Sequence, residues 1–253
     1  MSIKNLKTVI TGLVMLSIVT SCKKDHSTPS VTEKRVSKLM DGSTTVFAFT
    51  YNADGRLNTS YQEVQKYKAI FDYSNQSFAI KWYSNDILET EAKNAVIKND
   101  RLQSLFYQEY NNGSPSYNYT FHFAYNSDST LAKYYYDDNV YVFEYSGGNF
   151  SKVTHSDNGS IKDINTYEFY TNKPNKFNMP IQEFFTEFPV LAKNLLGKQN
   201  ANLMKKKTRV AGANTYTLTF TYQLDADGYV TQYTQVYQKN SEAPVTTTID
   251  VVY

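Results

Sequence analysis

The chain has 253 residues, of which 41% are hydrophobic and 20% are charged, and it contains 10 Gly and 6 Pro. This size and composition are those of a folded protein of one large or two small domains, and they exclude a collagen-like, low-complexity or disordered chain. Aromatic residues make up 15%, with 23 Tyr and 15 Phe. Because aromatic side chains favour half-buried strands, the composition predicts an all-β fold.

The first 21 residues have the pattern of a secretory signal. Lys4 and Lys7 precede an apolar run over residues 9–19, which is too short to span a bilayer, and small residues follow it. Residues 19–22, Val-Thr-Ser-Cys, resemble the bacterial lipoprotein signal, in which the cysteine is acylated and becomes the mature N-terminus. We therefore predict a signal peptide at 1–21 and lipid attachment at Cys22. The alternative is an incidental thiol after an ordinary signal peptide.

Cleavage before Cys22 changes the charge of the chain. Loss of Lys4 and Lys7 takes the 26 basic residues down by two, to match the 24 acidic ones. A neutral mature chain gives no electrostatic reason to expect nucleic acid or an anionic membrane as a partner. The predicted contact with the membrane is the N-terminal lipid, which needs two or more acyl chains for lasting anchoring. Cys22 is the only cysteine, so lipidation leaves no thiol for a disulfide or a nucleophile.

Residues 22–34 are polar and aperiodic, which is typical of a flexible tether. A dozen such residues reach on the order of 20 Å. The Cys-Lys-Lys-Asp sequence at 22–25 is also similar to the lysine-then-acid surface-export signal of Bacteroidota-type lipoproteins, and a plain solvated tether is the alternative. The predicted location is the outer membrane, on the cell surface or the periplasmic face.

Residues 35–253 are predicted to form a single domain, mainly an antiparallel β-meander. Apolar and polar residues alternate over 47–51, 78–82, 117–125, 141–145 and 216–224. Turn dipeptides such as Asn112-Gly113 separate most runs by ten to thirteen residues, close to the spacing of hairpin-connected strands. Turns this short cannot connect parallel strands. We expect a large curled sheet or a partly open barrel.

Three of the predicted hairpins share a sequence pattern. The segments 49–57, 123–131 and 221–230 each place an aromatic strand before an acidic turn and an aliphatic return strand. We interpret them as an eroded hairpin repeat, similar to the tyrosine and aspartate repeats of bacterial surface proteins. A hairpin repeat is a feature of architecture and does not imply activity.

One segment departs from the strand pattern. Apolar residues fall at helical spacing near 180–196, which predicts one helical segment packed on the sheet. The favoured interpretation is an apolar plug, because an open meander must cover its apolar face. The alternative is an amphipathic segment that binds a membrane or a partner.

The order of these features resembles the uncharacterised Bacteroidota lipoproteins with a porin-like fold. The resemblance rests on the lipid cysteine, the aromatic strands with Asp-Gly turns, the Asn-Lys-Phe-Asn-Met-Pro segment at 175–180 and the closing strand pair at 222–231. It covers most of residues 33–253. It implies a large curled antiparallel sheet around helical or loop material, and it implies no catalytic residues.

Motifs for catalysis are missing from the sequence. It contains no Gly-x-Ser-x-Gly, His-Glu-x-x-His, Walker or Gly-x-Gly-x-x-Gly motif. His122 and His155 have the settings of ordinary strand or turn residues. Residues 225–228 resemble half of a calcium loop, but the remaining ligands are missing, so a hairpin turn explains them better. We expect no catalytic residue, no cofactor and no metal.

The aromatic surplus is the remaining functional signal. Trp82, Tyr134, Tyr135 and Tyr136 are the candidate ligand-binding residues, because neighbouring rings on one strand point to opposite faces and cannot all be core in a single sheet. Exposed rings suit sugar stacking or protein contact. The alternative is that an open or two-layer sheet needs rings on both faces.

The predicted function is a non-catalytic, lipid-anchored module of the cell envelope that binds a glycan or another envelope protein, or acts as a scaffold for one. The enzyme alternative is a glycan- or peptide-degrading hydrolase whose carboxylates are brought together by the fold. A barrel that spans the membrane is disfavoured, because its lipid face would need long apolar stretches where Thr, Gln, Lys and Asp recur here.

Overall fold

The computed structural model of this chain describes residues 34–73, 77–176 and 195–253, which form 16 strands and contain no helix. The strands are β1 (Lys38–Asp41), β2 (Thr44–Tyr51), β3 (Leu57–Gln62), β4 (Tyr67–Tyr73), β5 (Phe78–Ser84), β6 (Ile87–Lys98), β7 (Arg101–Asn111), β8 (Ser114–Tyr125), β9 (Leu131–Tyr136), β10 (Asn139–Ser146), β11 (Asn149–Asp157), β12 (Ser160–Pro174), β13 (Asn202–Ala211), β14 (Asn214–Leu224), β15 (Val230–Lys239) and β16 (Val245–Val252). In this part of the chain no helix has the length and apolarity required to cross a bilayer.

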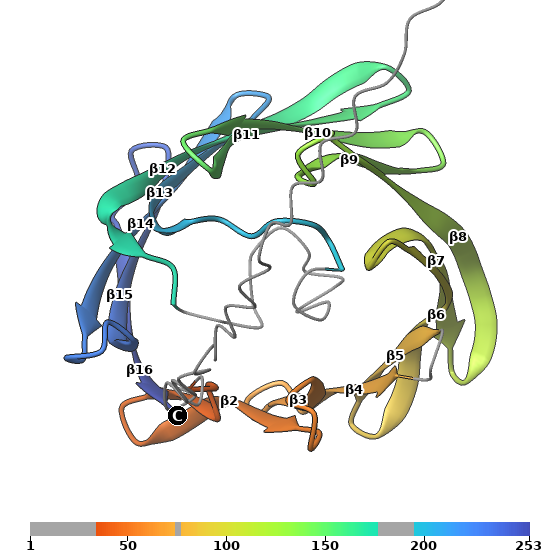
Figure 1. The fold of residues 1–253 in the computed structure, drawn as a ribbon, viewed down its shortest axis with the longest axis horizontal. Coiled ribbons are helices and arrows are strands. Elements are labelled where there is room, and N and C mark those ends of the chain that lie inside the picture. Colours follow the sequence, from red (N-terminus) through yellow and green to blue (C-terminus); the bar gives the residue numbers. More distant parts are fainter. Residues whose placement is uncertain (1–33, 74–76, 177–194) are drawn as a thin grey trace, which may run out of the picture. The chain divides into compact units, whose positions relative to one another are not determined.

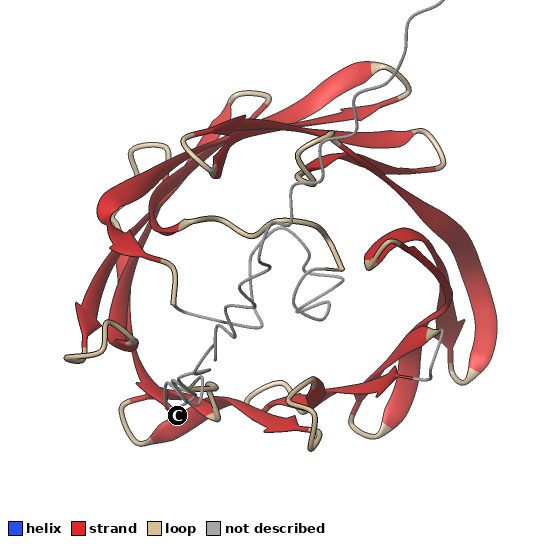
Figure 2. Ribbon diagram, viewed as in Figure 1, coloured by secondary structure: helices blue, strands red, loops and turns tan. Residues whose placement is uncertain are grey.

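Every strand pairs antiparallel with its neighbours in sequence, and β1 pairs with β16, so that the sheet closes into a barrel (Figures 1 and 2). Leu39 lies opposite Val251 at this closure. The predicted all-β antiparallel meander is confirmed, and the choice between a curled sheet and a barrel is settled by the closure.

Several predicted segments lie outside the described residues. They are the signal at 1–21, most of the tether at 22–34 and nearly all of the helical segment near 180–196. Of that last segment only Leu195 and Leu196 are described, and they form a turn.

The tight hairpins follow from their turn residues. Asn112 and Gly113 have φ of 49° and 78°, and Asn158 and Gly159 have φ of 50° and 74°. Two consecutive residues with positive φ form the turn whose twist matches that of the flanking strands, and Asn-Gly adopts it at the lowest cost. The dipeptides therefore determine where the chain reverses.

The three hairpins that share a sequence pattern also share a turn conformation. In each, the first amide of a five-residue turn donates to the fifth carbonyl at 2.8 Å; the turns are Asn52–Arg56, Asn126–Thr130 and Asp225–Tyr229. The fourth residue has positive φ in all three, at Gly55, Ser129 and Gly228. The similarity seen in the sequence thus corresponds to one local conformation.

Cross-strand partners share a face of the sheet, so the register defines two walls. Phe123, Tyr134, Tyr141 and His155 are successive partners across β8 to β11 and share one wall. Tyr125 lies on the same wall two residues after Phe123, and its hydroxyl donates to the carbonyl of Leu195 at 2.9 Å. Residues 195–201 run inside the ring (Figure 1), so this is the inner wall.

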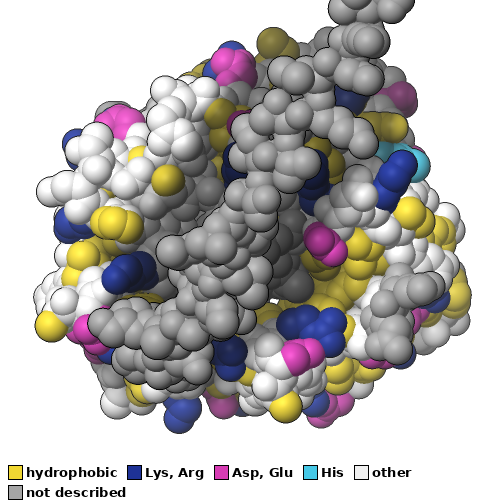
Figure 3. All heavy atoms as spheres, viewed as in Figure 1, with side chains coloured by type: hydrophobic (Ala, Val, Ile, Leu, Met, Phe, Trp, Pro, Cys, Tyr) yellow, Lys and Arg dark blue, Asp and Glu magenta, His cyan; other side chains and the backbone are white. Residues whose placement is uncertain are grey.

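The inner wall is aromatic and buried. Phe121 is 0% exposed and packs against five rings, those of Tyr107, Tyr119, Phe123, Tyr134 and Tyr136. Figure 3 shows hydrophobic side chains gathered inside the ring beside β6 to β8. The core of the protein therefore lines the inside of the barrel.

The outer wall is mainly polar, with isolated exposed apolar side chains such as Tyr135, Val142 and Val210. On β14 it presents Thr215, Thr217, Thr219, Thr221 and Gln223, which alternate with the inner-wall residues. Threonine hydroxyls pair across strands there, as between Thr234 and Thr248 at 3.0 Å. Barrels that span a bilayer have an apolar outer band and a polar interior, so the distribution here is the reverse of theirs.

Because successive turns alternate between the ends of the barrel, two ends can be defined. The entry end carries the start of β1, the turns 52–56, 99–100, 126–130, 147–148 and 225–229, and residue 253. The hairpin end carries the turns 42–43, 63–66, 85–86, 112–113, 137–138, 158–159, 212–213 and 240–244. Residues 175–201 leave and rejoin the wall at the entry end, between β12 and β13.

The inner wall is expected to dominate stability. Phe121→Ala removes the ring at the centre of the aromatic cluster and should lower the free energy of unfolding by about 3–5 kcal/mol. Thr120→Ala, the adjacent residue on the outer wall, should cost less than about 1 kcal/mol. Urea denaturation followed by tyrosine fluorescence measures both. Equal losses would contradict the assignment of the walls.

Candidate binding site at the hairpin end

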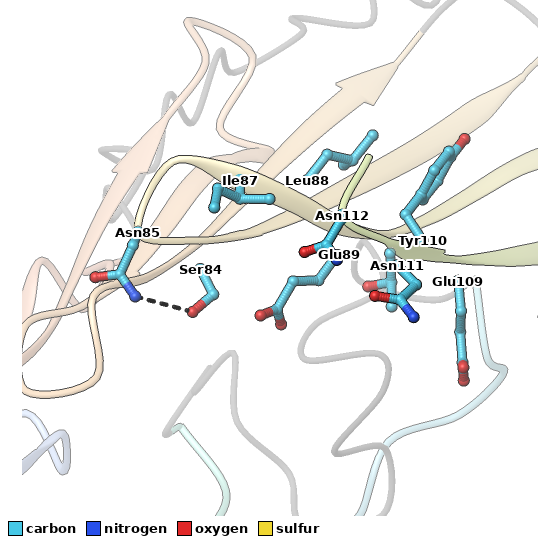
Figure 4. Close-up of a pocket in the computed structure, with 10 residues that line it drawn as sticks. Ser84, Asn85, Ile87, Leu88, Glu89, Glu109, Tyr110, Asn111 and Asn112 are labelled. Atoms are coloured by element: carbon cyan, nitrogen blue, oxygen red, sulfur yellow. Dashed lines mark hydrogen bonds between the residues drawn. The ribbon is translucent and has the colours of Figure 1, made fainter. Parts of the chain in front are cut away.

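A pocket opens between two neighbouring hairpins at the hairpin end (Figure 4). Its volume is about 420 Å³, within the usual range for small-ligand sites. It is lined by the tips of β5–β6 and β7–β8: Ser84, Asn85, Ile87, Leu88, Glu89, Thr90, Glu109, Tyr110, Asn111 and Asn112. Amide, hydroxyl and carboxylate groups therefore dominate the lining.

Two carboxylates occupy the inner side of this pocket. Glu89 and Glu109 extend to the same side of the hairpins, and Tyr110 extends to the other (Figure 4). The register pairs Trp82 with Thr90 and Thr90 with Glu109. After Trp82 the pairing shifts by one residue, and Glu89, next to Thr90, lies at this shift. Two acids 20 positions apart in the sequence thus line the same pocket.

Tyr67 belongs to the same group through Glu89. Its hydroxyl donates to the Glu89 carboxylate. Burial, and after it this hydrogen bond, raises the pKa of Tyr67 to about 12. Tyr67 therefore stays protonated and holds the Glu89 carboxylate in place.

Tyr117 continues the site toward β9. Its side chain is 50% exposed, and its hydroxyl donates to Asp137 Oδ2 at 2.6 Å. This bond raises the pKa of Tyr117, and the charge of Glu109 adds to the shift. Glu89, Glu109 and Asp137 therefore make one side of the hairpin end acidic, with tyrosine rings between the acids.

The inner wall carries a second polar cluster at β10 to β13, centred on buried Asp163. The Asp163 carboxylate accepts from Asn165 at 2.7 Å and from Arg209 at 3.2 Å, and it lies 3.0 Å from His155 Nδ1. The other ring nitrogen of His155 lies 3.1 Å from Asn139 Oδ1. A buried carboxylate with this many partners is compensated, so the cluster can hold the wall together.

The predicted ligand-binding residues fall on both walls. Trp82 and Tyr134 are 6% and 7% exposed on the inner wall, and Tyr136 is half-buried on the same wall. Tyr135 lies on the outer wall, where it is 36% exposed and stacks on His122 with ring centroids 5.0 Å apart. The structure brings Tyr134 and Tyr136 together and separates Tyr135 from them.

Other predicted positions are also located. Cys22 lies outside the described residues. Residues 225–229 form a hairpin turn in which Asp225 Oδ1 accepts from two backbone amides, and Asp225 Oδ2 pairs with Lys34 at 2.6 Å. Among the residues that the structure describes, no three His, Cys, Asp or Glu side chains are placed to hold a metal ion.

Sequence reasoning missed Glu89, Glu109 and Asp163. Period-2 alternation placed Tyr117 on one face with Tyr119 and Phe121, which was a usable signal for that residue. For the carboxylates no such signal exists, because their partners lie on other hairpins and depend on register.

No protein-family model and no curated protein matches this chain. Two solved structures are similar to it. A porin-like protein from Bacteroides uniformis ATCC 8492 has 15% identity and a TM-score of 0.61, with 86% of this chain and 96% of that chain covered. A porin-like protein from Bacteroides vulgatus ATCC 8482 has 14% identity and a TM-score of 0.56, with 87% and 99% covered. The likeness shows that this chain has the porin-like barrel fold.

The link between Tyr67 and Glu89 can be tested by titration. Glu89→Gln removes the charge and leaves only a neutral amide oxygen as acceptor for Tyr67, so the pKa of Tyr67 should fall from about 12 toward its usual value of 10.0. Burial remains, so the fall should be partial. NMR of tyrosine labelled at the ring Cζ measures it, with Tyr67→Phe assigning the signal.

Glu109→Gln is the matched control, because Glu109 lines the same pocket and does not bond to Tyr67. It should leave the Tyr67 titration in place. An unchanged pKa in Glu89→Gln would show that the two groups are not coupled in solution.

Proposed function

We propose that this protein is a lipid-anchored module of the bacterial cell envelope that binds a glycan at the hairpin end of its barrel, without catalysis. The observation that carries the proposal is the joint presence of an exposed tyrosine ring, Tyr117, and a pocket lined by amides, hydroxyls and carboxylates. The sequence adds the signal and the lipid cysteine, Cys22. The porin-like fold of its structural neighbours is compatible with an envelope location.

The chemistry of the site suits sugars. Rings with a polar tip can stack on the apolar face of a sugar, and they lose little conformational freedom when they do so. The carboxylates of Glu89 and Glu109 and the amides of Asn111 and Asn112 can accept from or donate to hydroxyl groups. A pocket of about 420 Å³ is large enough for a short saccharide.

A hydrolase is the second candidate, and one observation favours it. Glu89 and Glu109 extend to the same side of the pocket, as paired acids do in glycoside hydrolases (Figure 4). Release of reducing sugar from a bound glycan, lost in both Glu89→Gln and Glu109→Gln, would establish this activity. Binding without product over long incubation would support the binding module.

The glycan site can be tested with two exposed tyrosines on opposite walls. The full-length protein in detergent is titrated with neutral and acidic polysaccharides by calorimetry. Tyr117→Ala should weaken binding roughly tenfold, because it removes the exposed ring beside the pocket. Tyr135→Ala, the matched change on the outer wall, should leave affinity unchanged. A larger effect of Tyr135→Ala would move the site to the outer wall, and no binding by any glycan would refute the proposal.

Lipid anchoring has its own test. Cys22→Ser should abolish incorporation of radiolabelled palmitate and move the protein from the membrane fraction to the soluble fraction, because acyl chains supply the membrane affinity. Ser21→Ala, which keeps a small residue before the cysteine, should leave labelling intact. Labelling that persists in Cys22→Ser would exclude this cysteine as the attachment site.

A further inference from the structure

The two ends of the barrel differ in how they are connected to the rest of the chain. The chain enters the wall at the entry end, where the Lys34 ammonium lies 2.6 Å from Asp225 Oδ2 and 3.4 Å from Asp227 Oδ2. Just after it, the amide of Ser37 donates to the carbonyl of Val252 at 2.7 Å. The segment from Lys34 to Ser37 is therefore held at the entry end, by the Lys34 side chain and by the Ser37 backbone.

Only 11 residues, 23–33, separate the predicted lipid cysteine from Lys34. A chain of this length has a root-mean-square reach of about 20 Å. Six of the described strands have 10 to 12 residues and β12 has 15. At 3.3 Å per residue and the usual tilt, 10 to 12 residues give a wall of roughly 20–30 Å. Placing the hairpin end against the bilayer would force the tether to run along the full height of the wall.

The two ends also differ in their aromatic and cationic side chains. At the entry end, cationic groups lie over tyrosine rings within 6 Å of the centroid in six pairs: Lys34 and Lys176 over Tyr229, Arg35 over Tyr51, Arg56 over Tyr73, Arg101 over Tyr125 and Lys173 over Tyr170. Toward the hairpin end the pairs are fewer, with Lys66 over Tyr61 and Arg209 over Tyr216. Tyrosine with lysine or arginine is the combination that sits at the boundary between lipid and water. This belt of side chains suits the neighbourhood of headgroups.

The turns at the two ends of the barrel also differ in net charge. The described turns of the hairpin end contain one basic residue, Lys66, and five acidic residues: Glu63, Asp86, Asp137, Asp138 and Glu242. The described connections of the entry end balance Lys34, Arg35, Arg56, Lys176 and Lys198 against Asp54, Asp100, Asp128, Asp225 and Asp227. An anionic membrane surface therefore repels the hairpin end more strongly than the entry end.

We propose that the entry end of the barrel faces the lipid bilayer and that the hairpin end, with its pocket, opens away from it. This inference rests on the lipid anchoring in the proposed function and is independent of which ligand the pocket binds. The short tether places the entry end near the bilayer, and the acidic turns keep the hairpin end away from it. The pocket is then accessible to a large polymer that could not enter the space beneath the barrel.

Energy transfer from the two ends to a membrane surface tests this orientation. The full-length acylated protein is placed in vesicles of phosphatidylethanolamine and phosphatidylglycerol that contain a headgroup-labelled acceptor lipid. Donor dyes are attached to single cysteines made by Ala53→Cys at the entry end and Ala213→Cys at the hairpin end. Both alanines are exposed turn residues, so the two variants are matched. The acylated Cys22 carries no free thiol to compete for the dye.

The Ala53→Cys donor should transfer at least twice as efficiently as the Ala213→Cys donor, given a separation of roughly 20–30 Å along the wall. Equal or reversed transfer in protein that floats with the vesicles would overturn the orientation while leaving the anchoring and the glycan site intact. Protein that does not float would overturn the anchoring and the orientation together. Adding Cys22→Ser to each variant should abolish transfer from both dyes, and transfer that persists would show that the barrel binds lipid by another surface.

Discussion

The pairing of β1 with β16 is the interaction on which the rest of the structure depends. It joins segments more than 200 residues apart, with Leu39 opposite Val251. Closure leaves no strand edge open, and unpaired edges are the usual weakness of a large antiparallel sheet. It also creates an inside, so one face of every strand becomes enclosed at once. The aromatic side chains that alternate along the strands can then form a single buried wall without a second sheet.

Several tyrosine hydroxyls of the aromatic interior have backbone partners at the entry end, whereas the buried hydroxyl of Tyr73 has no hydrogen-bond partner among the described residues. The hydroxyl of Tyr51 donates to the carbonyl of Val36, that of Tyr125 to Leu102 and that of Tyr253 to Val230. The carbonyls belong to the segment before β1, to β7 and to β15, so each bond joins neighbouring parts of the rim. At these positions the tyrosine ring packs in the interior as a phenylalanine ring would, and its hydroxyl in addition donates a hydrogen bond to a backbone carbonyl.

The surfaces of the barrel differ in their chemistry. The outer wall is mainly polar and the inner wall is largely core, which leaves the two ends as the places where chemistry can differ. The entry end pairs cations with tyrosines, and the hairpin end gathers carboxylates, amides and the exposed ring of Tyr117. The wall of this chain therefore has the opposite polarity to that of a lipid-spanning barrel.

Local signals were sufficient for much of the fold. Period-2 alternation identified the strands, and Asn-Gly and Asp-Gly identified the turns. The sequence pattern common to residues 49–57, 123–131 and 221–230 corresponded to one turn conformation. These signals sufficed because each depends on residues that are close in sequence. Alternation could also place Tyr134 and Tyr136 on one face of their strand and Tyr135 on the other. It could not say which wall is inside, nor that Glu89 and Glu109 line one pocket or that His155 contacts Asp163. Those contacts depend on register, on shifts such as the one after Trp82, and on closure between the two ends of the chain, which only the complete tertiary structure determines.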